Sequence, residues 1–90
     1  MVSRRLKVVN PLGLHARAAA KLVRLANGFT SDISLERERG GLVADAKSIL
    51  SLLQLAAGSG SEILITACGD DEADAICAIE DLFGSGFGEV

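Results

Sequence analysis

The sequence predicts an α+β fold in which helices pack on one face of an antiparallel sheet. Segments that alternate polar and apolar residues, as half-buried strands do, are separated by segments with helical spacing. The segments 31–37 and 42–44 are joined by Gly40-Gly41, which indicates an antiparallel hairpin. The chain has 90 residues, so we expect one domain, residues 1–90, with one modest core.

The chain is expected to begin with a strand, a loop and a helix. Residues 5–9 form the strand, and residues 10–13 form the loop because Pro and Gly interrupt regular structure. Residues 16–27 are mostly good helix formers, and Asn27-Gly28 provides the C-terminal cap. This helix has an inward apolar stripe of Ala19, Leu22, Val23 and Ala26, and an opposite cationic face of Arg17, Lys21 and Arg24.

After the hairpin we expect a short helix, a strand and a last helix. Ser48 is a preferred cap and begins the short helix, which the loop 58–61 follows. Residues 62–68 form the clearest strand, with Ile63, Ile65 and Ala67 on one face. The acidic run 70–72 opens the last helix because acids favour the positive end of the helix dipole. Its inner face is expected to consist of Ala73, Ile76, Ile79 and Phe83, and residues 85–90 to form a mobile tail.

Composition disfavours several classes of protein. Apolar residues make up 49% of the chain, too many for a disordered protein, yet no apolar run is long enough to span a membrane. A cytosolic protein is therefore expected. The cysteines, Cys68 and Cys77, are too few for a disulfide scaffold and are expected as small apolar residues near the core, although a bridge between them stays open.

Charge is distributed unevenly along the chain. Residues 1–24 hold six basic and no acidic residues, whereas eight acidic and no basic residues follow from Glu62 onward. This asymmetry fits an anionic ligand or an acidic partner near the basic part, or simple solvation of the surface. Nucleic acid is disfavoured because the isoelectric point is near 5.0 and no aromatic residues interleave with the basic ones.

The one histidine, His15, lies between the glycine-containing loop and the start of the first helix. Backbone amides at a helix N-terminus, here those of Ala16, Arg17 and Ala18, favour anions. The Arg17 guanidinium can pair with phosphate oxygens, and a neutral imidazole can attack phosphorus. A reversible phosphohistidine held by these groups is one hypothesis. A purely structural His15, capping the helix or packing at its edge, is the other, and the residues alone leave both open.

A longer resemblance favours the first hypothesis. The run Asn10-Pro11-Leu12-Gly13-Leu14-His15-Ala16-Arg17, followed by Ala19-Ala20, resembles the active-site segment of HPr, the histidine-containing phosphocarrier family of the bacterial phosphoenolpyruvate-dependent phosphotransferase system. Residues 47–50 resemble the regulatory serine segment of this family. Residues 63–67 and 69–75 resemble its last strand and the start of its last helix. The resemblance covers nearly all of the chain in the same order.

The resemblance implies a function and a fold. Enzyme I would phosphorylate His15 on Nδ1, Arg17 would assist, and the group would pass to enzyme IIA domains for sugar uptake. The chain would be a carrier and no free-standing enzyme, with no cofactor and no metal. Its fold would be an open-faced sandwich, a four-stranded antiparallel sheet covered on one face by three helices. The partner surface would comprise Ala20, Arg24, Ile49, Leu50 and Leu53. Helical geometry suggests that at least one of the last three residues is core.

Two departures from the family pattern are present. The family most often has proline after the active-site arginine, and this chain has Ala18, which stiffens the first helical turn less. The segment 36–46 is slightly longer than in the commonest members, so the turn near Gly40-Gly41 is expected to be enlarged.

Ser48 has a structural and a regulatory interpretation. Its hydroxyl can cap the short helix, which is worth roughly 1 kcal/mol. The resemblance implies phosphorylation by an HPr kinase/phosphorylase, and a phosphate at a helix N-terminus is compatible with the cap.

Two other functions are alternatives to the carrier. One is a regulatory module of the nitrogen-related branch, whose phosphorylation state signals to partners without sugar transport. Another is an unrelated α+β binding domain that contains this motif by chance. A metal enzyme is disfavoured because there is a single histidine, and a nucleotide site is disfavoured because no phosphate-binding glycine loop is present. A monomer fits a domain that must dock and leave quickly.

Overall fold

The computed structural model of the chain describes residues 1–88. The elements in chain order are β1 (Val2–Lys7), α1 (Ala16–Ala26), β2 (Asp32–Arg37), β3 (Val43–Asp45), α2 (Ile49–Leu55), β4 (Glu62–Cys68), α3 (Glu72–Gly84) and a short 3-10 turn, η1 (Gly86–Gly88). None of the helices among residues 1–88 has the length and apolar character that a membrane span requires.

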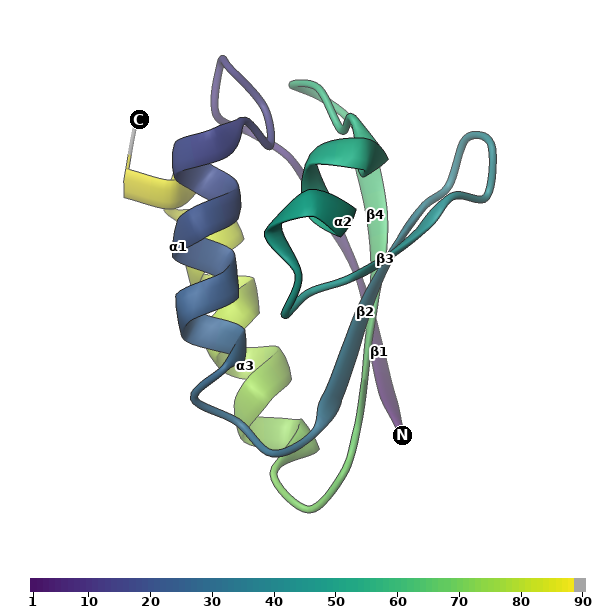
Figure 1. Cartoon of the computed structure of the whole chain (residues 1–90), viewed down its shortest axis with the longest axis vertical. Helices are drawn as coiled ribbons and strands as arrows, with labels where there is room; N and C mark the ends of the chain where they lie inside the picture. The colour runs from purple at the N-terminus through teal and green to yellow at the C-terminus, as the bar shows by residue number, and fades with distance from the viewer. Residues whose placement is uncertain (89–90) are drawn as a thin grey trace.

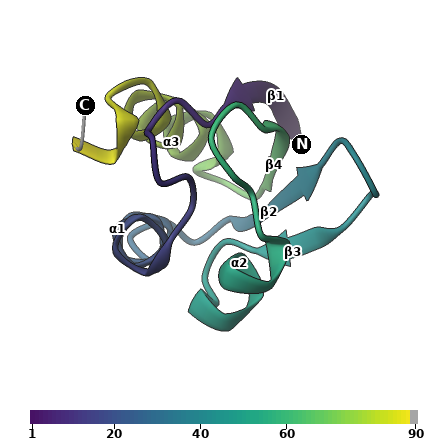
Figure 2. The same cartoon turned by 90° about the horizontal axis from the view of Figure 1, so that it is seen from above.

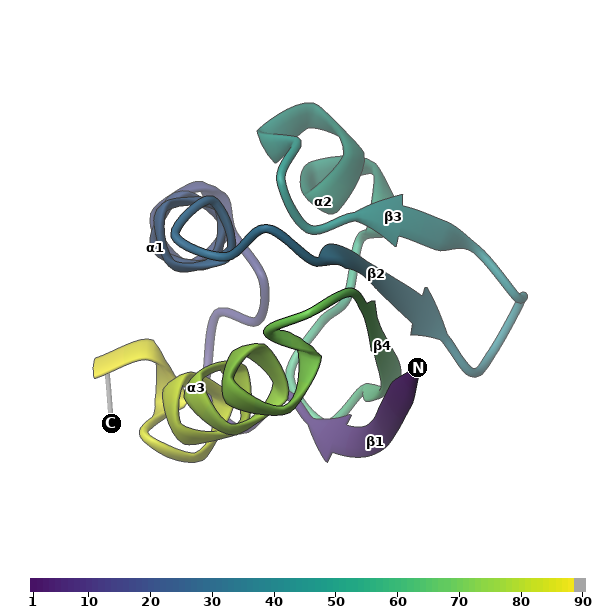
Figure 3. The same cartoon turned by 90° about the horizontal axis from the view of Figure 1, so that it is seen from below.

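The strands form one antiparallel sheet in the order β1-β4-β2-β3. Leu6 of β1 lies opposite Ile63 of β4, and Leu35 of β2 lies opposite Ile65. The three α-helices lie on one side of this sheet and leave the other side uncovered (Figures 1 and 2). Helix α1 lies between α2 and α3 and contacts both (Figure 3). The predicted open-faced α+β sandwich is therefore confirmed.

The core lies between the sheet and the helices. In β4 the predicted face of Ile63, Ile65 and Ala67 is buried, because alternate residues of a strand point to opposite sides. The helices supply the other half of the core through Leu22, Leu52, Leu55, Ile76, Ile79 and Phe83.

The structure corrects several boundaries and faces. The first strand runs from Val2 to Lys7, not from residue 5 to residue 9. In α1 Ala18 is buried while Val23 is only half-buried. In α3 Ala75 takes the inward place predicted for Ala73, which is exposed, because residues 75, 79 and 83 follow one another at single-turn spacing.

The two cysteines are not near the core. Both Cys68 and Cys77 are free and exposed. Cys68 follows the buried Ala67 in β4 and therefore points to the uncovered side of the sheet. Cys77 follows the buried Ile76 on the outer side of α3. The expectation that they act as small core residues is wrong.

The expected mobile tail is wrong for residues 85–88. Phe87 is fully buried, and its ring centroid lies 4.9 Å from that of Phe83. The Ser85 hydroxyl donates to the Leu82 carbonyl, and the Gly88 amide donates to the Ser85 carbonyl. Burial of an aromatic ring favours the folded turn over a free chain end. Residues 89 and 90 of the expected tail lie outside the described residues.

Asp71 joins the start of α3 to the start of β2. Its carboxylate accepts hydrogen bonds from the Thr30 amide (2.8 Å), the Ser31 amide (3.0 Å) and the Ser31 hydroxyl. Gly69 fits closely beside this contact, since a Cβ on it would lie 2.7 Å from the Ser31 Cα. The Ser31 hydroxyl and the Thr30 amide lower the pKa of Asp71 to about 2 from its ordinary 3.8.

This contact predicts a pH-dependent part of the stability. The folded-state pKa of Asp71 lies below its unfolded value, so its contribution is complete above about pH 4 and is lost as the pH falls through about 2. Asp71→Asn removes this contribution. We expect its urea midpoint at pH 7 to be lower than that of the wild type, and to decline less between pH 4 and pH 2. The measurement is urea unfolding followed by circular dichroism.

Asp70→Asn is the matched control, because Asp70 is the exposed neighbouring carboxylate. It should keep the wild-type decline. An Asp71→Asn variant whose midpoint declines as steeply as that of the wild type would contradict this account.

Candidate functional site

His15 occupies the N-cap position of α1. Its backbone is extended, with φ −81° and ψ −178°, and its Nδ1 accepts a hydrogen bond from the Arg17 amide at 3.3 Å. An accepting Nδ1 places the proton of a neutral imidazole on Nε2. The nucleophilic lone pair of Nδ1 is thereby directed at the positive end of the helix dipole. The capping role of His15 is therefore present, and it positions the ring for anion chemistry.

The loop before His15 is held by the loop that precedes β4. The Leu14 amide donates to the Ala57 carbonyl at 2.8 Å, and the buried Asn10 donates through Nδ2 to the Gly13 carbonyl at 2.7 Å. Gly13 has φ +68°, and a Cβ there would lie 2.7 Å from the Ala57 carbonyl oxygen and 2.8 Å from the Gly58 Cα. Only glycine at position 13 allows the two loops to approach this closely without a shift of backbone atoms.

A pocket of about 730 Å³ opens beside His15. Its lining residues are Pro11, Leu12, His15, Ala16, Arg17, Lys21 and Gly88. The structure therefore brings together His15, Ala16 and Arg17 of the predicted site. Ala18, the third predicted phosphate-binding position, is fully buried and does not line the pocket.

The sequence prediction missed three residues of the pocket wall, Pro11, Leu12 and Gly88. Gly88 falls in the predicted tail and follows Phe87, whose side chain is buried against Phe83. Pro11 and Leu12, which is 73% exposed, fall in the predicted loop. Lys21 was placed on the cationic face of the helix, and the pocket gives it a position beside Arg17.

The charges of the pocket suit an anion. Within the described part of the chain, its lining residues include the cations Arg17 and Lys21 and no carboxylate. A half-exposed imidazole, a helix N-terminus and these cations form a site that can accept and hold a phosphoryl group. The group needs little more than positioning and charge neutralisation for transfer.

The residues expected at a partner surface are placed on α1 and α2. Ile49, Leu50 and Leu53 are all exposed, by 40%, 70% and 38%. The expectation that at least one of them is core is wrong, because residues 49, 50 and 53 span only about 100° of a helix with 3.6 residues per turn. Leu52 and Leu55 fill the core instead. Ala20 is half-buried and Arg24 is exposed on the neighbouring helix α1.

Ser48 is the N-cap of α2. Its hydroxyl accepts a hydrogen bond from the Ser51 amide at 3.3 Å, as its cap position predicts. It does not line the pocket beside His15.

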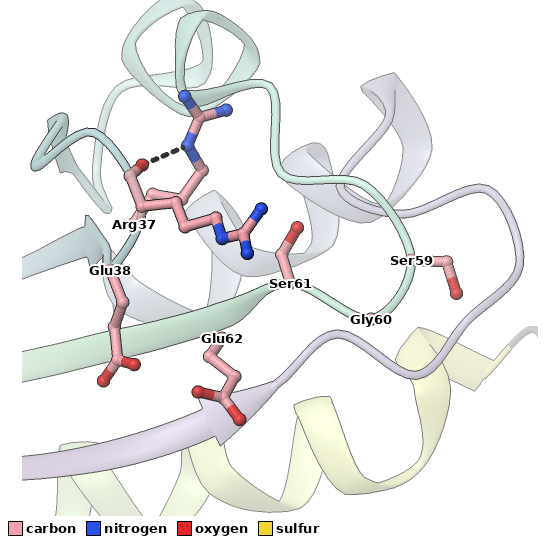
Figure 4. Close-up of a pocket in the computed structure, with 7 residues that line it drawn as sticks. Arg37, Glu38, Ser59, Gly60, Ser61 and Glu62 are labelled. Carbon is pink, nitrogen blue, oxygen red and sulfur yellow. Dashed lines mark hydrogen bonds between the residues drawn. The ribbon is translucent and has the colours of Figure 1, made fainter.

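A second pocket of similar size lies where the β2–β3 connection meets the loop before β4 (Figure 4). Two of its charged side chains, those of Arg37 and Glu38, make contacts that stabilise the fold. Arg37 donates through Nε to the Arg39 carbonyl and through a terminal nitrogen to the Leu55 carbonyl, at the end of α2. Glu38 forms an ion pair with Arg5 at 2.8 Å. Among the described residues that line this pocket there is no imidazole and no thiol, in contrast to the His15 pocket.

The chain is similar to known proteins over nearly its whole length. Residues 2–85 match the family described as "PTS HPr component phosphorylation site". The chain is 44% identical to the phosphocarrier protein HPr of Cupriavidus necator over 89 residues, which are 99% of this chain and 98% of that protein. It is 48% identical to the phosphocarrier protein NPr of Proteus mirabilis over 86 residues, which are 96% and 94% of the two chains.

The fold also matches a solved structure. HPr-C-His of Thermoanaerobacter tengcongensis superposes with a TM-score of 0.93 at 39% identity, covering 100% of this chain and 99% of that one.

The loop geometry predicts the effect of filling the space beside Gly13. Gly13→Ala and Gly41→Ala both place alanine at a positive φ, of +68° and +65°, but nothing lies within 4 Å of a Cβ on Gly41. Gly41→Ala should cost roughly 1–2 kcal/mol for the left-handed backbone alone. Gly13→Ala should cost about 1–3 kcal/mol more, because backbone atoms must move.

Urea unfolding measures both costs against the wild type. Equal losses of stability in the two variants would contradict the proposed close packing of the His15 loop against Ala57 and Gly58.

Proposed function

The chain belongs to the HPr family of phosphocarriers of the phosphotransferase system, and on this premise we propose that His15 is its phosphoryl acceptor. An enzyme I would donate the group and enzyme IIA domains would receive it. The observation that carries this proposal is the orientation of His15, whose Nδ1 faces the first amides of α1 inside a cationic pocket.

The transfer exchanges one phosphorus–nitrogen bond for another. The Nδ1 lone pair of His15 attacks phosphorus on the phosphohistidine of the donor. The donor's phosphorus–nitrogen bond breaks, and its electron pair stays with the donor imidazole. The Arg17 guanidinium and the first-turn amides of Ala16 and Arg17 then hold the phosphoryl oxygens. The Arg17 amide exchanges its bond to Nδ1 for one to a phosphoryl oxygen. The chain acts as a carrier and not as a free-standing enzyme.

The exposed apolar residues of α2 support a docking surface for these partners. Ile49, Leu50 and Leu53 lie together on the exposed side of α2, which contacts α1, the helix that carries Ala20 and Arg24. Apolar side chains surrounded by polar residues favour reversible association with other proteins. We propose that the protein works in the cytoplasm as a monomer of 9.3 kDa. A native mass of two chains would contradict the monomer.

A regulatory role in the nitrogen-related branch is the second candidate. It is favoured by the similarity to an NPr, which is as high as the similarity to an HPr. Both candidates need the same phosphoryl site. Transfer to a sugar-specific enzyme IIA favours the first candidate, and transfer confined to a nitrogen-branch enzyme IIA favours the second.

Phosphoryl transfer from enzyme I tests the role of His15. After incubation with enzyme I and phosphoenolpyruvate, intact mass should show one acid-labile phosphate on the wild type and none on His15→Ala. Arg17→Gln should be phosphorylated roughly tenfold to a hundredfold more slowly, because a charged donor to the transferred group is lost. Arg39→Gln, which removes an exposed arginine outside the His15 pocket, should retain the wild-type rate. Phosphate on His15→Ala would overturn the assignment.

We also propose that phosphorylation of Ser48 regulates docking. A phosphate there adds about two negative charges beside Ile49 and Leu50, at a helix end that tolerates anions. Ser48→Asp keeps a capping oxygen and adds charge, whereas Ser48→Asn keeps the cap without charge. Both should have nearly wild-type stability. Only Ser48→Asp should be phosphorylated more slowly by enzyme I, and equal rates in all three proteins would exclude this regulation.

A further inference from the structure

Lys21 joins the phosphoryl pocket to the end of the chain. It lies one helical turn after Arg17, and its side chain lines the same pocket as His15. Long side chains on a helix lean toward its N-terminus, which carries the Lys21 ammonium toward the first turn of α1. There its Nζ donates to the Phe87 carbonyl at 2.6 Å.

The Phe87 carbonyl is itself fixed in place. The Phe87 side chain is buried against Phe83, and its backbone has φ 57°, in the left-handed region. Gly88 follows with φ +75°, and a Cβ there would lie 3.3 Å from the Lys21 Nζ. The turn η1 lies beside the start of α1 (Figure 1). Lys21 and η1 therefore form one wall of the pocket.

This arrangement positions the Lys21 ammonium group for binding an anion. A lysine ammonium has three N–H donors, and the Phe87 carbonyl accepts from one of them. Because the long Lys21 side chain is already held in place, less of its conformational entropy is lost when an anion binds. Among residues 1–88, which the structure describes, no carboxylate lines the pocket beside this charge.

We propose that Lys21 is a second anion-binding residue of the phosphoryl site, and that the C-terminal turn holds its ammonium in place. Arg17 and Lys21 would then bind phosphoryl oxygens from neighbouring turns of α1. The inference rests on the proposed role of His15.

A small phosphoryl donor tests this inference without any partner protein. Phosphoramidate transfers its phosphoryl group to an imidazole: the lone pair forms a phosphorus–nitrogen bond, and ammonia leaves with the electron pair of the old one. We compare the rates of phosphorylation of the wild type with those of three variants. Lys21→Met loses the charge and the bond, Lys21→Gln can keep a bond to the Phe87 carbonyl without charge, and Lys21→Arg keeps both.

We expect Lys21→Met and Lys21→Gln to react about threefold to tenfold more slowly than the wild type, and Lys21→Arg to retain most of the rate. The difference should shrink in about 1 M salt, where the Debye length is near 3 Å. Wild-type rates in Lys21→Met or Lys21→Gln, or a difference that salt leaves unchanged, would overturn the role of the charge.

Lys47 provides a matched control. Its Nζ donates to the Phe29 carbonyl at 2.8 Å in a similarly half-buried position, but it does not line the pocket. Lys47→Met should react at the wild-type rate. An equal loss of rate in Lys47→Met would mean that Lys21 acts only through the net charge of the protein. His15→Ala separates the two proposals, because phosphate uptake by that variant, or none by the wild type, refutes the role of His15 itself.

Discussion

The site depends on the close approach of the loop before α1 to the loop before β4. Gly13 lies so near Ala57 and Gly58 that a methyl group would collide with backbone, and the Leu14 amide bonds to the Ala57 carbonyl. These contacts fix where the chain turns into α1, and hence where His15 stands. They join residues that are more than forty positions apart, so the site forms only when the sheet has formed. A histidine on a free loop would lack this orientation.

The chemistry of the site then follows from the helix itself. The first turn of α1 presents amides that have no helical partner, and His15 directs its Nδ1 at one of them. The cations of the pocket come from neighbouring turns of the same helix, so a single element carries the proposed nucleophile, the amide donors and the positive charge. The domain itself remains small and open on one face of its sheet. Such a site suits a carrier, which must release its group as readily as it accepts it.

Much of this could be predicted from the sequence because it depends on local patterns. Alternation in residues 62–68 predicted the buried face of β4, and the sequence around His15 predicted the start of α1. The sequence predictions are wrong where contacts between residues far apart in the chain determine the structure. Phe87 is buried by packing against Phe83, and its carbonyl is held by Lys21, 66 residues away, so no local pattern marks it as ordered. Cys68 is exposed because one side of the sheet carries no helix, which the composition of a strand does not reveal. The local sequence predicts only that Asp71 favours the helix dipole, but its carboxylate accepts hydrogen bonds from the amides of Thr30 and Ser31.

The central claim is that the geometry of α1 presents Nδ1 of His15 as the phosphoryl acceptor. The most direct test is nuclear magnetic resonance of the phosphorylated protein labelled with ¹⁵N in its one histidine. The account predicts phosphorus coupling to Nδ1, with a proton on Nε2. Phosphorus bonded to Nε2, or to any group other than this imidazole, would contradict it.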